Sequence, residues 1–443
     1  MSYPQSRAPL RVPYCTIVAL LAVILTISTP GVATPGLENG SSDEKFLDKL
    51  EYDSILYFIR ESNPANGLIK DSSRPGSPCS VAAVGFGLTA ICIGESRGWI
   101  AKEDAYQLVL KTLKTFRDEV PQEKGFFYHF LDMRTARRAW NSEVSSIDTA
   151  LFLAGALFAG EYFKGTEAEK IAGELYERVD WPWMLNGRNV LCMGWKPHDG
   201  FLMFYWDSYS EAMILYALAI GSPTHPINAE YWLEWKRPVD SYKDYNLVYS
   251  STGSIFTYQY SHAWIDFRQL PAENLSSSPG LYSPGLEAGI NYYDNSINAV
   301  KANREFCIDN SDKYKTYGEE FWGLSACLGP DGYKGYGAKP GDGLNDGTIP
   351  PYGMAGSIVF DPINSLNGLK NLYQRHKNFL YGKYGFKDAF NIDSKWWAEE
   401  YLGIDVGITA LMIENYRTGL VWNKFMELPA IKNWVSKALT IKK

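Results

Sequence analysis

The chain has 443 residues, with 43 basic and 50 acidic side chains and a formal net charge of −7. This length allows two or three domains, although large helical barrels also reach it as one domain. Acidic and basic residues are interspersed, and no basic stripe predicts a surface for nucleic acid.

The N-terminus has the order of charges and apolar residues that is typical of a signal peptide. Arg7 and Arg11 precede an apolar run over 14–27, and small residues follow as far as Ala33. This run is short for a membrane span, so we expect export to the periplasm or outside the cell and no span after cleavage. The predicted organisation is a signal peptide over 1–33, a flexible leader over 34–44 and one domain over 45–443.

Helical periodicity continues through most of the remaining chain. Amphipathic segments, which keep one face in water, alternate with segments that are apolar on every face. The amphipathic segments lie near 45–61, 102–117, 166–178, 227–236, 290–308 and 363–378, and the apolar ones near 79–94, 146–160, 209–220, 254–265, 318–327 and 404–416. Six such pairs predict an all-α fold, an (α/α)6 barrel or six-hairpin toroid with long aromatic loops at its mouth. A short strand-rich stretch is expected at 191–206.

Three of the apolar segments begin with an acidic residue: Asp148, Glu211 and Asp405. If the inner helices run in parallel, these acids meet at one mouth of the barrel. Convergent carboxylates can perform general acid–base chemistry on sugars. For any one acid the alternative of a helix cap is equally good, because Ser145 and Ser208 stand three residues before Asp148 and Glu211. The repetition favours a site. The same end is expected to hold Ser80, residues 259–266, Glu319 and Glu320.

The cysteines do not form a recognisable framework. Five follow the predicted leader: Cys79, Cys92, Cys192, Cys307 and Cys327. Their odd number and the absence of a Cys-x-x-Cys pair argue against a disulfide scaffold and a structural zinc site. We expect most of them to be buried as small apolar residues, and we predict neither a metal nor another cofactor.

Several longer strings are more specific than composition. They are GFFYHFLDM at 125–133, WNSEVSSIDT at 140–149, YSEAMILYALAIGSPTHP at 209–226, FTYQYSHAWIDFR at 256–268, YLGIDVG at 401–407 and IENYR at 413–417. Taken in this order they closely resemble the bacterial glycoamylase-like family, over about residues 45–435. The resemblance implies an (α/α)6 barrel and an exported bacterial protein, in a family whose characterised branch contains endo-β-1,2-glucanases and whose older label is glucoamylase.

The resemblance also implies roles for particular residues. Glu211 corresponds to the general acid, and Asp405 lies in the helix that carries the proposed base. Val406 departs from the polar residue of relatives, so Asp148 is the alternative base. An inverting pair needs roughly 6.5–9.5 Å between carboxyl groups. Aromatic neighbours such as Trp206 would raise the pKa of Glu211. Predicted substrate contacts are Glu143, Trp206, Tyr209, His262, Arg268, Tyr333 and Tyr336, although a structural role suits His262 and ion pairing suits Arg268.

The leading hypothesis is an exported glycoside hydrolase acting on a glucan, specifically an inverting endo-β-1,2-glucanase. Two alternatives remain open at this stage. One is a glucan hydrolase of another linkage specificity, of the glucoamylase kind. The other is a non-catalytic glycan-binding periplasmic protein whose acids serve only as helix caps. The expected partner is an oligo- or polysaccharide rather than a nucleic acid, and the protein is expected to act as a monomer.

Overall fold

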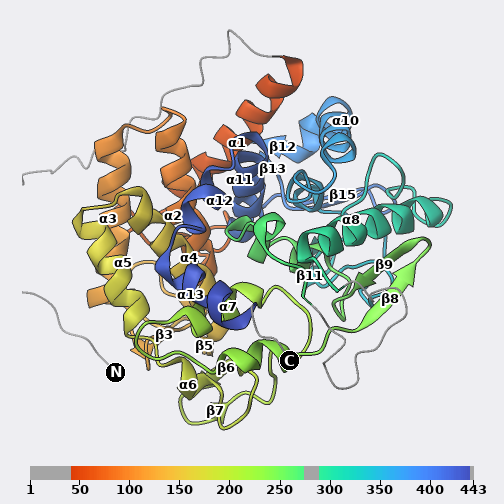
Figure 1. Cartoon of the computed structure of the whole chain (residues 1–443). Coiled ribbons are helices and arrows are strands. Elements are labelled where there is room, and N and C mark those ends of the chain that lie inside the picture. The colour runs from red at the N-terminus through yellow and green to blue at the C-terminus, as the bar shows by residue number, and fades with distance from the viewer. Residues whose placement is uncertain (1–40, 274–288, 440–443) are drawn as a thin grey trace, which may run out of the picture.

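The computed structural model describes residues 41–273 and 289–439, and helices are the predominant regular structure in this part of the chain (Figure 1). The predicted signal peptide and residues 34–40 of the predicted leader lie outside it. The first helix begins at Ser42, three residues before the expected start at Lys45. No helix in the described residues has the length and apolar character that crossing a membrane requires.

The helices are α1 (Ser42–Arg60), α2 (Val81–Ser96), α3 (Lys102–Asp118), α4 (Ser146–Tyr162), α5 (Glu167–Glu177), α6 (Trp181–Met184), α7 (Met213–Gly221), α8 (Tyr292–Asp309), α9 (Pro351–Ala355), α10 (Pro362–Leu380), α11 (Gly403–Arg417), α12 (Leu420–Phe425) and α13 (Pro429–Ala438), with 3-10 turns η1 (Ala229–Leu233), η2 (Ile255–Tyr258), η3 (Ser261–Ala263) and η4 (Phe267–Gln269). The strands are β1 (Cys79–Ser80), β2 (Gln122–Glu123), β3 (Phe126–Phe127), β4 (Phe130–Leu131), β5 (Val144–Ser145), β6 (Gly194–Lys196), β7 (Gly200–Phe201), β8 (Val239–Tyr242), β9 (Tyr245–Val248), β10 (Cys327–Gly329), β11 (Gly332–Lys334), β12 (Tyr381–Gly382), β13 (Gly385–Phe386), β14 (Phe390–Asn391) and β15 (Trp396–Trp397).

The helices α2, α4, α7 and α11 form the interior of the molecule. Almost every residue in them is buried, as expected for segments that are apolar on all faces. Helix α2 packs between α11 and α4, and α4 also contacts α7. The amphipathic helices α1, α3 and α5 cover this group from outside, so the predicted alternation of inner and outer helices is confirmed for these elements (Figure 1).

Three predicted helices are wrong. Residues 318–327 contain no helix, because Gly323 has a φ of +98° that a right-handed helix excludes, and the chain there leads into β10. The short helix α9 instead packs against α10 and α11. Residues 254–265 form only the turns η2 and η3, and the segment at 227–236 is reduced to η1. The strand-rich stretch near 191–206 is confirmed: β6 pairs with β7 and with β5.

Two glycines bring α2 and α4 into direct backbone contact. A Cβ built on Gly85 would lie 2.1 Å from the carbonyl oxygen of Leu151, and one on Gly155 would lie 1.9 Å from the carbonyl oxygen of Gly85. Neither position has room for a side chain. The two helices therefore cross at the smallest separation that their backbones permit.

A buried ion-pair network joins α1, the C-terminal end of α2 and the C-terminal end of α11. The Arg97 guanidinium binds the Glu414 carboxylate at 2.6 Å, and Arg417 binds Glu51 at 2.8 Å. Glu51 and Glu414 are fully buried, so each carboxylate depends on these arginines for compensation of its charge. The five cysteines in the described residues are all free and buried, as predicted for most of them.

Candidate active site

A cavity of about 600 Å³ opens where the inner helices begin. Its wall includes Ala82 in α2, Asp148 in α4, Ile404 in α11 and Glu211 just before α7. This volume lies within the range of roughly 300–1,000 Å³ that is usual for small-molecule sites. The N-terminal ends of four inner helices therefore converge on one cavity. Its full lining is Asp71, Ser72, Arg74, Pro75, Gly76, Ser77, Ser80, Ala82, His129, Phe130, Trp140, Ile147, Asp148, Leu151, Glu211, Phe256, Tyr260, Leu328, Tyr333, Leu402 and Ile404.

Glu211 lines this cavity and does not cap a helix. Helix α7 begins only at Met213, and the main-chain carbonyl of Glu211 accepts a hydrogen bond of 2.7 Å from the Ser261 hydroxyl. That contact fixes the backbone and leaves the carboxyl group directed to the cavity. Burial, aided by the nearby charge of Asp148, raises the pKa of Glu211 to about 7. Near neutral pH this carboxyl group can both hold and release a proton.

Asp148 combines a cap with a place in the cavity. Ser145 is the N-cap of α4, and its hydroxyl accepts from the Asp148 amide at 3.2 Å and also donates to the Asp148 carboxylate. The capping interpretation is thus correct for Asp148. It does not exclude a role in the site, because the same carboxylate lines the cavity.

His129 lies between two of the acids. Its Nδ1 is 3.0 Å from the Glu143 carboxylate and its Nε2 is 3.5 Å from Asp148. Burial alone would lower the pKa of His129, but Asp148, Glu143 and Asp71 together raise it to about 9. At neutral pH the imidazole is therefore a cation that neutralises part of an acidic wall.

Asp71 is a cavity carboxylate that the sequence did not single out. It lies in the segment between α1 and α2, where no helix periodicity or capping pattern marks it. Burial raises its pKa to about 6, while His129 opposes the shift. Its main-chain amide and carbonyl bind Pro78 and Gly403, so the residue ties the loop to the start of α11.

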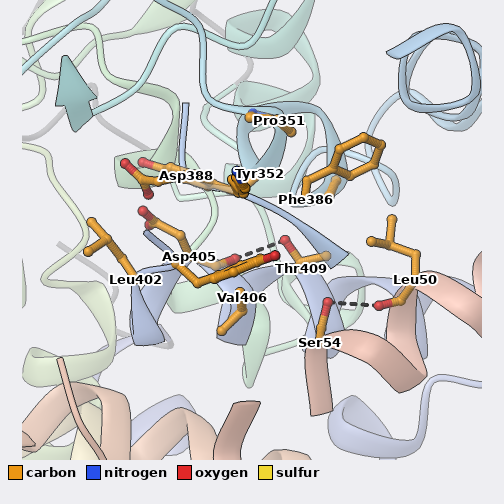
Figure 2. Close-up of a pocket in the computed structure, with 13 residues that line it drawn as sticks. Leu50, Ser54, Pro351, Tyr352, Phe386, Asp388, Leu402, Asp405, Val406 and Thr409 are labelled. Atoms are coloured by element: carbon orange, nitrogen blue, oxygen red, sulfur yellow. Dashed lines mark hydrogen bonds between the residues drawn. The ribbon is translucent and has the colours of Figure 1, made fainter. Parts of the chain in front are cut away.

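Asp405 lies in the first turn of α11, as predicted, but behind the cavity wall. Its carboxyl group enters a small adjacent cavity and faces Asp388, which the sequence analysis missed (Figure 2). The Leu328 amide donates to one Asp388 oxygen at 2.7 Å. Within the described residues, neither Asp405 oxygen accepts a hydrogen bond of normal geometry.

Two buried carboxylates that face each other need a shared proton, because repulsion prevents both from ionising. Burial raises the pKa of Asp388 to about 6, and burial together with the charge of Asp388 raises that of Asp405 well above its usual range. At neutral pH they therefore act as one unit with a single negative charge.

The structure places the predicted substrate contacts in two groups. Tyr333 lines the cavity with more than half of its side chain exposed. Glu143 does not line the cavity but binds the cavity residue His129. The others lie away from the cavity and have packing roles in place of the expected substrate contact. Trp206 donates to Ser146, Tyr209 packs on Tyr258, His262 contacts Ser296, Arg268 pairs with Asp266, and Tyr336 donates to Asp346.

Among the other residues expected at this mouth, Ser80 and Tyr260 do line the cavity, whereas Glu320 and Gln259 lie elsewhere. Glu320 binds Arg375 on the surface, and Gln259 donates to the Gly353 carbonyl in the core. In the described part of the chain, no three side chains among His, Cys, Asp and Glu converge as a metal ligand set would.

Comparison with known proteins gives relatives along most of the chain. An exo beta-1,2-glucooligosaccharide sophorohydrolase (non-reducing end) from Parabacteroides distasonis is 29% identical, and the match covers 90% of this chain. The chain spans only 58% of the length of that relative.

Two solved structures match more completely. One is an endo-beta-1,2-glucanase from Chitinophaga pinensis in complex with sophorotriose and glucose, with a TM-score of 0.81 and 27% identity over 90% of this chain and 98% of that one. The other is a "putative glucoamylase" from Bacteroides uniformis, with a TM-score of 0.81 and 28% identity over the same shares. The glycoamylase family model, described as "Putative glucoamylase", matches residues 203–429.

Proposed function

Because this chain belongs to the glycoamylase family, we propose that it is a glycoside hydrolase that cleaves β-1,2-linked glucans with Glu211 as its general acid. The observation that carries the proposal is the position of Glu211 in the wall of a cavity that also holds four other charged side chains: Asp71, Arg74, His129 and Asp148. The β-1,2 linkage is supported by the described activities of the relatives from P. distasonis and C. pinensis.

The fold is proposed to be an (α/α)6 barrel. Four inner positions are occupied by α2, α4, α7 and α11, and four outer ones by α1, α3, α5 and α10. The turns η2 and η3 and the short helix α9 take the two remaining inner positions, and α8 packs outside η2. In such a barrel the active site lies at one end, as the cavity does here.

In the proposed reaction Glu211 protonates the glycosidic oxygen as the bond to the anomeric carbon breaks. A carboxyl group with a pKa of about 7 is largely protonated when substrate binds at mildly acidic pH, and it remains acidic enough to release the proton. Water then attacks the opposite face of the sugar and loses its proton to a base, which inverts the configuration. The products are a new reducing end and a shortened glucan.

The Asp388–Asp405 pair is proposed as the base. The pair carries one negative charge with a proton affinity near pH 6, which suits a general base for neutral conditions. Since it lies behind the cavity wall, it receives the proton through a relay of water or substrate hydroxyl groups past Tyr260. Asp148 is the second candidate, supported by its direct place in the cavity, but its carboxylate is already engaged by Ser145 and His129.

Export is proposed on the N-terminal pattern alone. A polymeric glucan is met outside the cytoplasm, and the predicted signal peptide would direct the enzyme there.

Release of reducing ends from a panel of α- and β-linked glucans tests the function. We expect wild-type protein to release them from β-1,2-glucan, and Glu211→Gln to lose roughly 10²–10⁴-fold in kcat with an unchanged melting temperature. Retention of wild-type turnover in Glu211→Gln would refute the acid. Binding of the panel without any hydrolysis by wild-type protein would favour the glycan-binding alternative.

A further inference from the structure

Trp140 is a large apolar side chain at the rim of the cavity that stays in water. Its side chain is 68% exposed, although it belongs to the cavity lining. Full burial of an indole ring is strongly favourable, so a ring exposed at the edge of a site is available to a ligand. The other large exposed aromatic in the lining is Tyr333, 55% exposed.

The backbone holds Trp140 in place at some cost. Trp140 and Asn141 have φ values of +53° and +55°, in the left-handed region that residues with a side chain seldom adopt. The Arg138 side chain braces this turn by donating to the carbonyl oxygens of Asn141 at 2.8 Å and Ser142 at 2.6 Å. The turn therefore presents the indole as a fixed surface.

A column of rings connects Trp140 to the floor of the cavity. Its indole contacts the Phe130 ring with centroids 5.0 Å apart, and Phe130 stacks on the His129 imidazole at 3.9 Å. His129 in turn binds Glu143 and Asp148. Direct packing thus links Trp140 at the rim to the acidic residues of the cavity wall.

We propose that Trp140 is an outer sugar-binding subsite, on whose indole face a pyranose ring of the glucan stacks beyond the cleavage position. This subsite proposal rests on the proposed function. It adds that a long glucan chain contacts Trp140 and binds more tightly than a short chain that does not extend to it. Aromatic faces suit the apolar C–H face of a pyranose, and a fixed ring loses little entropy on binding. Binding affinity is therefore expected to increase with the chain length of the substrate.

Calorimetric titration of the Glu211→Gln protein with β-1,2-gluco-oligosaccharides of increasing length tests the subsite without turnover. Adding Trp140→Ala should weaken binding of long ligands by roughly tenfold and leave the disaccharide unchanged. Trp140→Phe should restore most of the long-chain affinity. Phe204→Ala is the matched control, because Phe204 is 69% exposed but does not line the cavity.

The outcomes separate the two proposals. If the parent and Trp140→Ala proteins bind each ligand length with the same affinity, the subsite proposal is wrong and the proposed function is unaffected. The same holds if Trp140→Ala weakens the binding of all lengths equally. If the parent instead binds a glucan of another linkage, and the gain in affinity with chain length again depends on Trp140, the subsite proposal is supported and the proposed β-1,2 specificity is wrong. If the parent binds none of the glucans tested, both proposals fail.

Discussion

Asp388 and Asp405 direct their carboxyl groups at each other from two separate parts of the chain, a loop after β13 and the first turn of α11 (Figure 2). Both are buried, and burial opposes their ionisation. The pair is therefore a site whose charge depends on pH, and its effects on stability and on rate have definite signs.

Asp388→Asn should stabilise the protein at alkaline pH. The folded-state pKa of Asp388 is raised to about 6 from its ordinary 3.8, so its contribution to stability is full below pH 4 and falls as pH rises through 6. An amide keeps an acceptor for the Leu328 amide and offers a donor to Asp405. We expect a gain on the order of 1–2 kcal/mol at pH 8 and none near pH 4, measured by urea unfolding. A loss at pH 8 would contradict the shared proton.

The pH dependence of kcat/KM should be bell-shaped and narrow. The base must be ionised, so the rate rises as the Asp388–Asp405 pair loses its first proton near pH 6. The acid must be protonated, so the rate falls as Glu211 ionises near pH 7. Asp388→Asn should move the acidic limb, because it removes one carboxyl group of the pair, and leave the basic limb in place. If the acidic limb of the kcat/KM profile does not move in Asp388→Asn, the base is Asp148. In that case Asp148→Asn should abolish the acidic limb.

His129→Gln should reduce stability most at neutral and acidic pH. The folded-state pKa of His129 is raised to about 9, so its contribution is full below pH 6.5 and is lost as pH rises through 9. The variant leaves Glu143 and Asp148 without their shared cation. We expect a loss on the order of 2 kcal/mol at pH 6 that nearly disappears at pH 10. His225→Gln, which changes a histidine outside the cavity, is the control.

Arg97→Met should destabilise the fold without touching the cavity. Removing the guanidinium leaves Glu414 with a buried carboxylate that has lost its closest cation, at a cost of about 3–5 kcal/mol. Lys114→Met breaks the exposed pair with Glu167 and should cost less than about 1 kcal/mol. Thermal unfolding of both variants checks this difference. Equal losses would mean that the network of Arg97 is not what stabilises this end.

The exported form should begin close to residue 34. The order of Arg7 and Arg11, an apolar run and small residues up to Ala33 predicts cleavage there. N-terminal sequencing of protein recovered from the medium or periplasm of the producing bacterium measures the start. Recovery of a chain that still begins at Met1 would contradict the signal peptide.

The sequence revealed the elements whose pattern is local. Helices α2, α4 and α11 are apolar on every face, and that property alone predicts their burial. Asp148 and Glu211 could be found because each stands at the start of such a segment. The helix predicted at 318–327 is wrong because apolar residues there enter the core from an irregular segment, in which Gly323 has a positive φ.

The missing parts of the site depend on contacts between distant segments. Asp71 and Asp388 lie in loops, and only the fold brings them beside Asp148 and Asp405. Trp206 and Tyr209 were expected at the substrate, but their rings fill the core, which is the commoner fate of large aromatic side chains. Nothing in the local sequence distinguishes them from Trp140, whose exposure results from the turn that carries it.

The backbone contact between Gly85 and Gly155 has a consequence for motion. Helices that touch main chain to main chain cannot slide or separate slightly, since any relative shift would either open a void or produce a collision. The two parts of the cavity wall that α2 and α4 support must therefore move as one rigid body. Adjustment to the substrate is then left to segments outside this helix pair, such as the β10–β11 hairpin that carries Tyr333.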